Sequence, residues 1–190
     1  MRRRRCLQGL GALGAAALLP GLRAQTEAAP PPEARAEWPE ARLQGSARLR
    51  FFGLHVYDAR LWVGPDYPRE APAREDWAGR AFLLELQYAR ALDGVKIAER
   101  SIEEMARAGP LEPRQSEGWL AFMSQAFPNV VAGTRLSALH RPGETVRFFV
   151  DGRPGREIRD SAFADRFFGI WLAPWTSQPA MRRQLLGGAP

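Results

Sequence analysis

Two arginines and two tyrosines are the side chains of this chain best suited to bind an anionic ligand. Arg48 and Arg50 flank Leu49 in a stretch that alternates apolar and polar residues. If this stretch is a strand, the two arginines share the face opposite Leu49. Tyr57 and Tyr88 lie in two further stretches rich in aromatic and aliphatic residues. A guanidinium can hold a carboxylate or phenolate through two hydrogen bonds, and a tyrosine hydroxyl can add another. The sequence therefore predicts that these four side chains form an anion-binding cluster, with two solvent-exposed arginines on an edge strand as the alternative.

The sequence gives little support to metal, nucleophile or cofactor chemistry. His55 and His140 are the only histidines and have no carboxylate partner at metal-binding spacing, whereas a metal needs three or four ligands. Cys6 is the only cysteine and lies in the N-terminal segment, so the rest of the chain has no disulfide and no cysteine-based metal site. No serine has the Gly-X-Ser-X-Gly context of a nucleophile elbow. We therefore predict no metal and no cofactor, and we assign no catalytic residue.

The N-terminus has the pattern of an export signal. Four arginines at positions 2–5 precede a short apolar stretch that runs from Cys6 to Leu19, and a small-residue site ends at Ala24. This pattern is typical of a removable signal peptide over residues 1–24, of the twin-arginine type or of the ordinary Sec type. The apolar stretch is shorter than the ~20 residues of a membrane-spanning helix, and no later segment is long and uncharged enough. We expect a periplasmic or otherwise exported protein without a transmembrane segment in its mature form.

The distribution of charge argues against a nucleic-acid partner. The chain has 27 Lys and Arg against 21 Asp and Glu, a net charge of +6. Residues 1–24 contain five arginines and no acid, so the remainder carries 22 minus 21, or +1. A nearly neutral domain lacks the basic excess of a nucleic-acid-binding surface.

The remaining chain divides into a leader and one domain. Residues 25–42 are rich in Pro, Ala and Glu and show no period, so we expect a flexible leader before a domain over residues 43–190. The patterns predict two strands, or one long bent strand, over 43–63, and further strands over 82–88, 135–140, 146–150 and 157–159. Helices are predicted between Asp93 and Gly109, from Ser116 to Phe127, from Asp160 to Leu172 and from Ser177 to Leu186. This order favours an α+β domain, an antiparallel sheet with a helical layer on one face.

Four long stretches carry a further pattern. They are Leu43–Gly64, Phe82–Met105, Val146–Ile158 and Phe163–Gly187, and together they span most of the domain. These stretches resemble the chalcone isomerase family, specifically its bacterial exported branch of chalcone isomerase-like proteins. The resemblance implies an open-faced β-sandwich, in which a large antiparallel sheet is covered by helices and a ligand cleft lies between the two layers.

The resemblance does not extend to the residues of the plant enzymes. Plant chalcone isomerases close a flavanone ring with an Arg and with a Thr, Tyr, Lys and Asn around the reacting enone. The matching motifs place Phe52 at the Thr and Ile97 at the Tyr, with Glu104 near the Asn. Neither Phe nor Ile can donate a hydrogen bond to a developing enolate. This departure resembles the non-catalytic, fatty-acid-binding members of the family, in which an Arg and a Tyr hold a carboxylate.

Three hypotheses of function follow from these observations. The leading one is an exported, non-catalytic binder of a fatty acid or a similar amphipathic carboxylate in a cleft between sheet and helices. The second is a chalcone isomerase-type intramolecular lyase or isomerase that uses a different residue set in the same cleft. The third is a cell-envelope interaction module whose cleft is packed shut. A fold alone does not decide among them, but the depth of the cleft separates the third from the other two.

Overall fold

One antiparallel sheet forms the centre of the molecule. The computed structural model describes residues 29–69 and 76–188. Each strand of the sheet pairs with its neighbours in sequence, in the order β1 to β6. The strands are β1 (Arg42–Phe51), β2 (Leu54–Val63), β3 (Phe82–Tyr88), β4 (Arg135–His140), β5 (Val146–Val150) and β6 (Arg153–Ile158). The predicted α+β class with an antiparallel sheet is confirmed.

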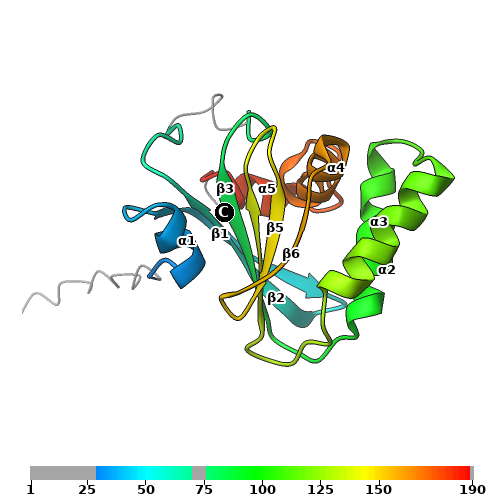
Figure 1. Ribbon diagram of the computed structural model, residues 1–190. Coiled ribbons are helices and arrows are strands. Elements are labelled where there is room, and N and C mark those ends of the chain that lie inside the picture. Colours follow the sequence, from blue (N-terminus) through cyan, green and yellow to red (C-terminus); the bar gives the residue numbers. More distant parts are fainter. Residues whose placement is uncertain (1–28, 70–75, 189–190) are drawn as a thin grey trace, which may run out of the picture.

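The helices lie on both sides of this sheet, with most of them on one side (Figure 1). They are α1 (Pro32–Glu37), α2 (Gly94–Met105), α3 (Pro113–Ala126), α4 (Ser161–Leu172) and α5 (Pro179–Leu185), with a short 3₁₀ helix η2 (Ala106–Ala108). We call the sheet face that packs against α2 and α4 the inner face, and the face under α1 the outer face. Within the ranges that the structure describes, no helix combines the length and the apolar character needed to cross a membrane.

The segment before the sheet differs from its prediction. Residues 25–42 were expected to form a flexible leader, but α1 packs on the outer face, where Ala34 is fully buried in a cluster with Trp62 and Leu83. The composition is misleading because Pro32 stands in the first turn of α1, where a proline starts a helix instead of breaking it. The leader prediction is therefore wrong for this helix and for the start of β1 at Arg42. The predicted signal peptide, residues 1–24, lies outside the described residues.

Two features fix the start of α2, which carries much of the site described below. The carboxylate of Asp93 accepts hydrogen bonds from the backbone N–H groups of Val95 (2.9 Å) and Lys96 (3.2 Å), and so caps the helix as predicted. A Cβ atom on Gly94 would collide with the backbone oxygen of Phe127. The first turn of α2 therefore lies directly against the end of α3, at a distance that only glycine permits.

Aromatic side chains fill the main core between the inner face and the helices. Phe82 and Phe148 from the sheet and Phe163 and Phe168 from α4 are fully buried. The rings of Phe163 and Phe167 stack with centroids 5.3 Å apart, and other pairs meet edge to face. The predicted helical face of α4 is thus a core face, and α4 is held firmly against the sheet.

Other boundaries shift by a few residues. Strand β6 begins at Arg153 and not near Glu157, and its exposed edge position explains why no apolar alternation marks it. Helix α3 begins at Pro113, one turn before the predicted cap at Ser116. Gly53, considered as a bulge, lies instead in the two-residue turn between β1 and β2.

Candidate functional site

An apolar pocket lies between the inner face of the sheet and helices α2 and α4. Its volume is about 430 Å³, within the range of roughly 300–1,000 Å³ that is usual for small-molecule sites. Most of its lining is aliphatic or aromatic, including Leu49, Val56, Leu84, Leu86, Leu136, Phe148, Phe167 and Ile170. The α4 wall of the pocket is packed tightly into the aromatic core. The cleft expected between sheet and helices is present and open.

Both predicted tyrosines line this pocket. Tyr57 and Tyr88 face each other across β2 and β3, with ring centroids 5.8 Å apart. The indole N–H of Trp171 donates a hydrogen bond of 2.9 Å to the Tyr57 hydroxyl, which leaves the hydroxyl proton of Tyr57 available to another acceptor. Burial of this hydroxyl raises the pKa of Tyr57 to about 12, and burial also raises the pKa of Tyr88. Both hydroxyls are therefore protonated at neutral pH and can donate a hydrogen bond to a ligand.

Helix α2 presents a polar stripe to the same pocket. Ile97, Arg100, Ser101 and Glu104 follow the i, i+3, i+4, i+7 spacing of one helical face, and all four line the pocket. Glu104 is buried, and the Arg100 guanidinium donates to one of its oxygens. The other oxygen makes no hydrogen bond and lies 3.7 Å from Nε of Arg107. Helix α2 thus brings an ion pair, and not only apolar surface, to the wall of the pocket.

Two further cations line the mouth. Lys96 is engaged by Glu99, with 2.7 Å between Nζ and Oε2. Arg90, in the segment between β3 and α2, is exposed. No carboxylate in the described part of the chain pairs with Arg90. Its guanidinium is therefore available to an anion that enters the pocket.

The two predicted arginines of β1 do not line this pocket. Arg48 binds Asp58 on β2 with two hydrogen bonds, of 2.7 and 3.1 Å, and Arg50 donates to the backbone oxygen of Gly53. Leu49, between them, faces the pocket. Because side chains alternate along a strand, its neighbours must point to the other face. The prediction that Arg48 and Arg50 join the tyrosines is wrong, and their placement on an edge strand agrees with the exposed alternative.

The histidines serve structural contacts at two separate places. His55 lies 3.2 Å from Asp58. Desolvation alone would raise the pKa of Asp58, but the hydrogen bonds and the charge of Arg48, with a smaller contribution from His55, lower it. His140 is buried, and its Nδ1 lies 2.9 Å from the backbone oxygen of Arg80. Among the residues that the structure describes, no group of three or more His, Cys, Asp or Glu side chains is arranged to hold a metal ion.

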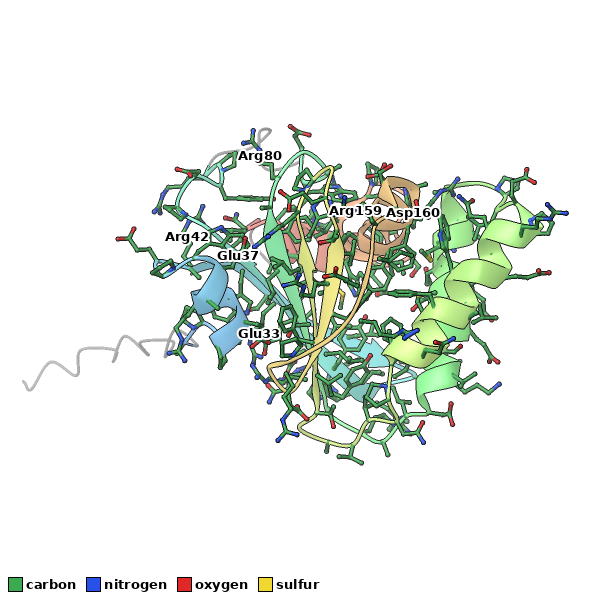
Figure 2. The ribbon with its side chains drawn as sticks, in the orientation of Figure 1. Glu33, Glu37, Arg42, Arg80, Arg159 and Asp160 are labelled. Atoms are coloured by element: carbon green, nitrogen blue, oxygen red, sulfur yellow. The ribbon has the colours of Figure 1, made fainter. Side chains whose placement is uncertain are left out.

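A second hollow, of about 500 Å³, has a polar lining beside the β4–β5 turn. Figure 2 shows two of its lining residues, Arg159 and Asp160, near the start of α4. The Asp160 carboxylate already accepts from the backbone N–H of Phe163 and from the indole N–H of Trp119 (2.9 Å). The Asp160 carboxylate therefore supports the fold, and we assign no ligand to this hollow.

Sequence reasoning missed the cations of the true mouth. Val95, Ala98, Ile102 and Met105 recur at helical spacing and form the apolar pattern that predicts α2, but this pattern does not include the neighbouring stripe from Ile97 to Glu104. For Arg100 and Glu104 a signal was present, because a charged pair at i, i+4 and a Ser stand beside an Ile on one helical face. Of the positions matched to the enzymes, Ile97 and Glu104 do line the pocket, whereas Phe52 lies in the β1–β2 turn and is 91% exposed.

An antiparallel sheet with strands in sequence order, most of its helices on one face and an apolar pocket between the two layers is an α+β architecture. The family model of chalcone isomerase-like proteins matches residues 27–187. The chain therefore belongs to the chalcone isomerase-like family, as its sequence pattern implied.

Comparisons with individual proteins agree with this membership. The fold is similar to the crystal structure of a fatty-acid binding protein of Arabidopsis thaliana, with a TM-score of 0.59 and 12% identity, covering 77% of this chain and 87% of that protein. At this identity the likeness shows the fold alone. An uncharacterized protein of Haemophilus influenzae is 26% identical over 145 residues, which are 75% of this chain. The chain spans 66% of the length of that relative.

Proposed function

We propose that this protein is a non-catalytic binder of a fatty acid or a similar amphipathic carboxylate. The observation that carries the proposal is an apolar pocket of about 430 Å³ lined by Arg90, whose guanidinium has no carboxylate partner among the described residues. The apolar walls suit a hydrocarbon tail, and a guanidinium suits a carboxylate. The fatty-acid binding protein of similar fold supports the proposal by analogy.

The pocket also bears on the alternatives. A cavity of this size argues against an interaction module whose cleft is packed shut. For a chalcone isomerase-type reaction, Ile97 offers no hydrogen bond to a developing enolate, and Phe52 is outside the pocket. We therefore expect no loss of chalcone absorbance above the buffer rate.

The test is the affinity for a long-chain fatty acid, measured by titration calorimetry on the delipidated protein. Replacement of the charge in Arg90→Gln is expected to weaken binding about tenfold or more, because a hydrogen bond to a charged group contributes roughly 1.5–3 kcal/mol. Arg159→Gln is the matched control. Arg159 is also an exposed arginine without a carboxylate partner among the described residues, and it lines the other hollow.

Three results would count against the proposal. One is a delipidated wild-type protein with no measurable fatty-acid affinity. Another is an equal loss in Arg90→Gln and Arg159→Gln. The third is an equal affinity for the uncharged methyl ester, because the ester carries no charge for Arg90 to bind.

We also propose that the protein acts outside the cytoplasm, on the basis of the N-terminal pattern of residues 1–24. Mass spectrometry of the protein from a periplasmic fraction is expected to find Gln25 as the first residue. Recovery of the uncut chain from the cytoplasmic fraction alone would overturn this expectation.

A further inference from the structure

The surface around the pocket mouth carries hydrophobic side chains that the fold leaves uncovered. Among the described residues the large exposed hydrophobic side chains are Phe51, Phe52, Leu54, Val95 and Val131. Single exposed hydrophobic residues are ordinary on protein surfaces. A group that gathers at one end of a molecule, however, marks an interaction surface.

These side chains share one end of the sheet. Phe51 and Leu54 pair across the turn between β1 and β2, and Phe51 also lines the pocket. Val95 is in the first turn of α2, beside the pocket residue Lys96. Val131 lies in the loop between α3 and β4, which is hydrogen-bonded to the segment between β3 and α2. Figure 1 shows these two connecting segments side by side at the lower end of the sheet. The apolar surface thus borders the entrance to an apolar pocket.

The conformation of Phe52 gives a second reason to look for a partner. Phe52 has a φ of 47° and Gly53 a φ of 78°, as in the tight hairpin turns that favour Asn-Gly. A bulky residue is rare in this left-handed region of backbone space. Phe52 nevertheless holds the position with its ring 91% exposed. Its ring meets the ring of Phe51 edge to face, with centroids 4.5 Å apart, but both residues remain exposed. The two rings therefore form one apolar surface at the tip of the hairpin, which is suited to insert into an apolar medium.

The charges beside this surface indicate what the medium is. Arg50 and Arg90 flank it, and neither has a carboxylate partner in the part of the chain that the structure describes. The carboxylate of Asp93, two residues before Val95, is engaged as the cap of α2. Exposed Phe and Leu side chains beside arginines are the combination that binds the interface of an anionic bilayer.

We propose that the pocket mouth docks on an anionic lipid bilayer, with Phe52 inserted into the interface and Arg50 and Arg90 at the headgroups. An amphipathic ligand could then pass between bilayer and pocket without crossing water. The passage of a ligand rests on the function proposed above, whereas the docking itself does not.

The test measures insertion at residue 52, because residues 1–24 are arginine-rich and apolar and could bind vesicles by themselves. Phe52→Trp is mixed with vesicles of phosphatidylglycerol and brominated phosphatidylcholine, whose bromine quenches tryptophan inside the bilayer. Quenching above that of the wild-type protein is expected. Glu144→Trp is the control, because Glu144 is exposed in the β4–β5 turn, at the other end of the sheet. It is expected to show no added quenching, although it removes a negative charge.

Two further variants separate the roles of the ring and of the charge. Phe52→Asn suits the backbone of the turn and is expected to fold, but to bind phosphatidylglycerol vesicles about tenfold more weakly, because the ring is lost from the interface. Arg50→Gln is expected to weaken binding at low salt only, relative to Arg159→Gln. Neither Phe52 nor Arg50 lines the pocket, so fatty-acid affinity in solution is expected to stay unchanged in both.

The outcomes distinguish the two proposals. Absence of added quenching in Phe52→Trp overturns the docking surface, even if fatty acid binds. Light scattering could instead show a dimer of the wild-type protein that is lost in Phe52→Asn. This result would also overturn the bilayer proposal, because a second copy of this chain would then occupy the same surface. Insertion of residue 52 into the bilayer without any affinity for fatty acid would support the docking surface and overturn only the proposed ligand.

Discussion

The two faces of the sheet use buried polar groups in different ways. On the outer face, Glu85 is 3% exposed and accepts hydrogen bonds from Arg60 (3.0 Å) and from the indole N–H of Trp62 (2.7 Å). Glu33 of α1, labelled in Figure 2, is also buried there and accepts from Ser137 at 2.8 Å. These carboxylates are enclosed by side chains that belong to the fold. On the inner face, by contrast, polar groups stand at the wall of a cavity.

The difference shows which polar groups support the fold and which can serve a ligand. A buried charge is costly unless it is paired, so the outer-face acids and their partners must be kept together. The hydroxyls of the pocket tyrosines and the guanidinium of Arg90 border open space and retain hydrogen-bonding capacity. Changes on the outer face should therefore affect stability, and changes on the inner face should affect ligand affinity.

The largest expected effect tests the outer face. Glu85→Ala leaves the indole N–H of Trp62 buried without its acceptor and removes the ion pair with Arg60. Breaking a buried pair should lower the free energy of unfolding by about 3 kcal/mol. Urea unfolding measures this change. Glu85→Gln keeps an oxygen for Trp62 and should lose less. If the comparison of the faces holds, the folded Glu85→Ala protein binds fatty acid with unchanged affinity.

Tyr57→Phe removes a single oxygen atom, the Tyr57 hydroxyl, from the inner face. The variant removes the acceptor of the Trp171 indole N–H, which should lower the free energy of unfolding by about 1 kcal/mol. It also removes a hydroxyl that can donate to a ligand, so fatty-acid affinity should fall by a similar free energy. Titration calorimetry and urea unfolding give the two values. A loss of stability without any loss of affinity would show that the ligand does not reach Tyr57.

The pH dependence of stability tests the packed end of the inner face, where His140 is 3% exposed between Phe82 and Phe168. Burial lowers the pKa of His140 below its usual 6.5, so the unfolded chain binds this proton at a higher pH than the folded protein does. The stability that neutral His140 contributes is therefore fully present above pH 6.5, and it is lost as the pH falls from 6.5 through the lower pKa of the folded protein.

The measurement is the difference in urea unfolding between about pH 7.5 and about pH 5.5. His140→Gln keeps a donor for the Arg80 oxygen but does not titrate, so the variant should lose part of the difference seen in the wild-type protein. If the free energy of unfolding depends on pH equally in the wild-type protein and in His140→Gln, groups other than His140 cause that dependence.

Much of the fold could be predicted because its signals are local. The predicted bounds of β3, β4 and β5 agree with the structure, since short apolar runs between turn residues define them. Asp93 and Asp160 were predicted at the starts of their helices and do cap them. Helix α1 was missed because its stability comes from packing on Trp62 and Leu83, which a local pattern does not reveal.

The candidate site could be predicted only in part. Tyr57 and Tyr88, predicted to bind a ligand, do line the pocket, because strand alternation places both on the face of the hydrophobic core. Whether they bind a ligand stays a prediction. The alternation in β1 does not show which of its two faces packs against the helices, because tertiary packing decides this. The side of the sheet on which Arg48 and Arg50 lie could therefore not be predicted. Arg90 gives no sequence signal, since its role depends on the point where the segment between β3 and α2 crosses the pocket mouth.

The smallest expected effect comes from Arg48→Gln, and it tests the placement of β1 most directly. The ion pair of Arg48 with Asp58 is exposed, and such pairs contribute little to stability. Hydrogen bonds and the charge of Asp58 raise the pKa of Arg48, which agrees with a pairing that needs no ligand. We expect urea unfolding and fatty-acid titration of Arg48→Gln to match the wild-type values within error. A loss of affinity as large as that of Arg90→Gln would place the anion on the β1 edge, and the division between the two faces would then be wrong.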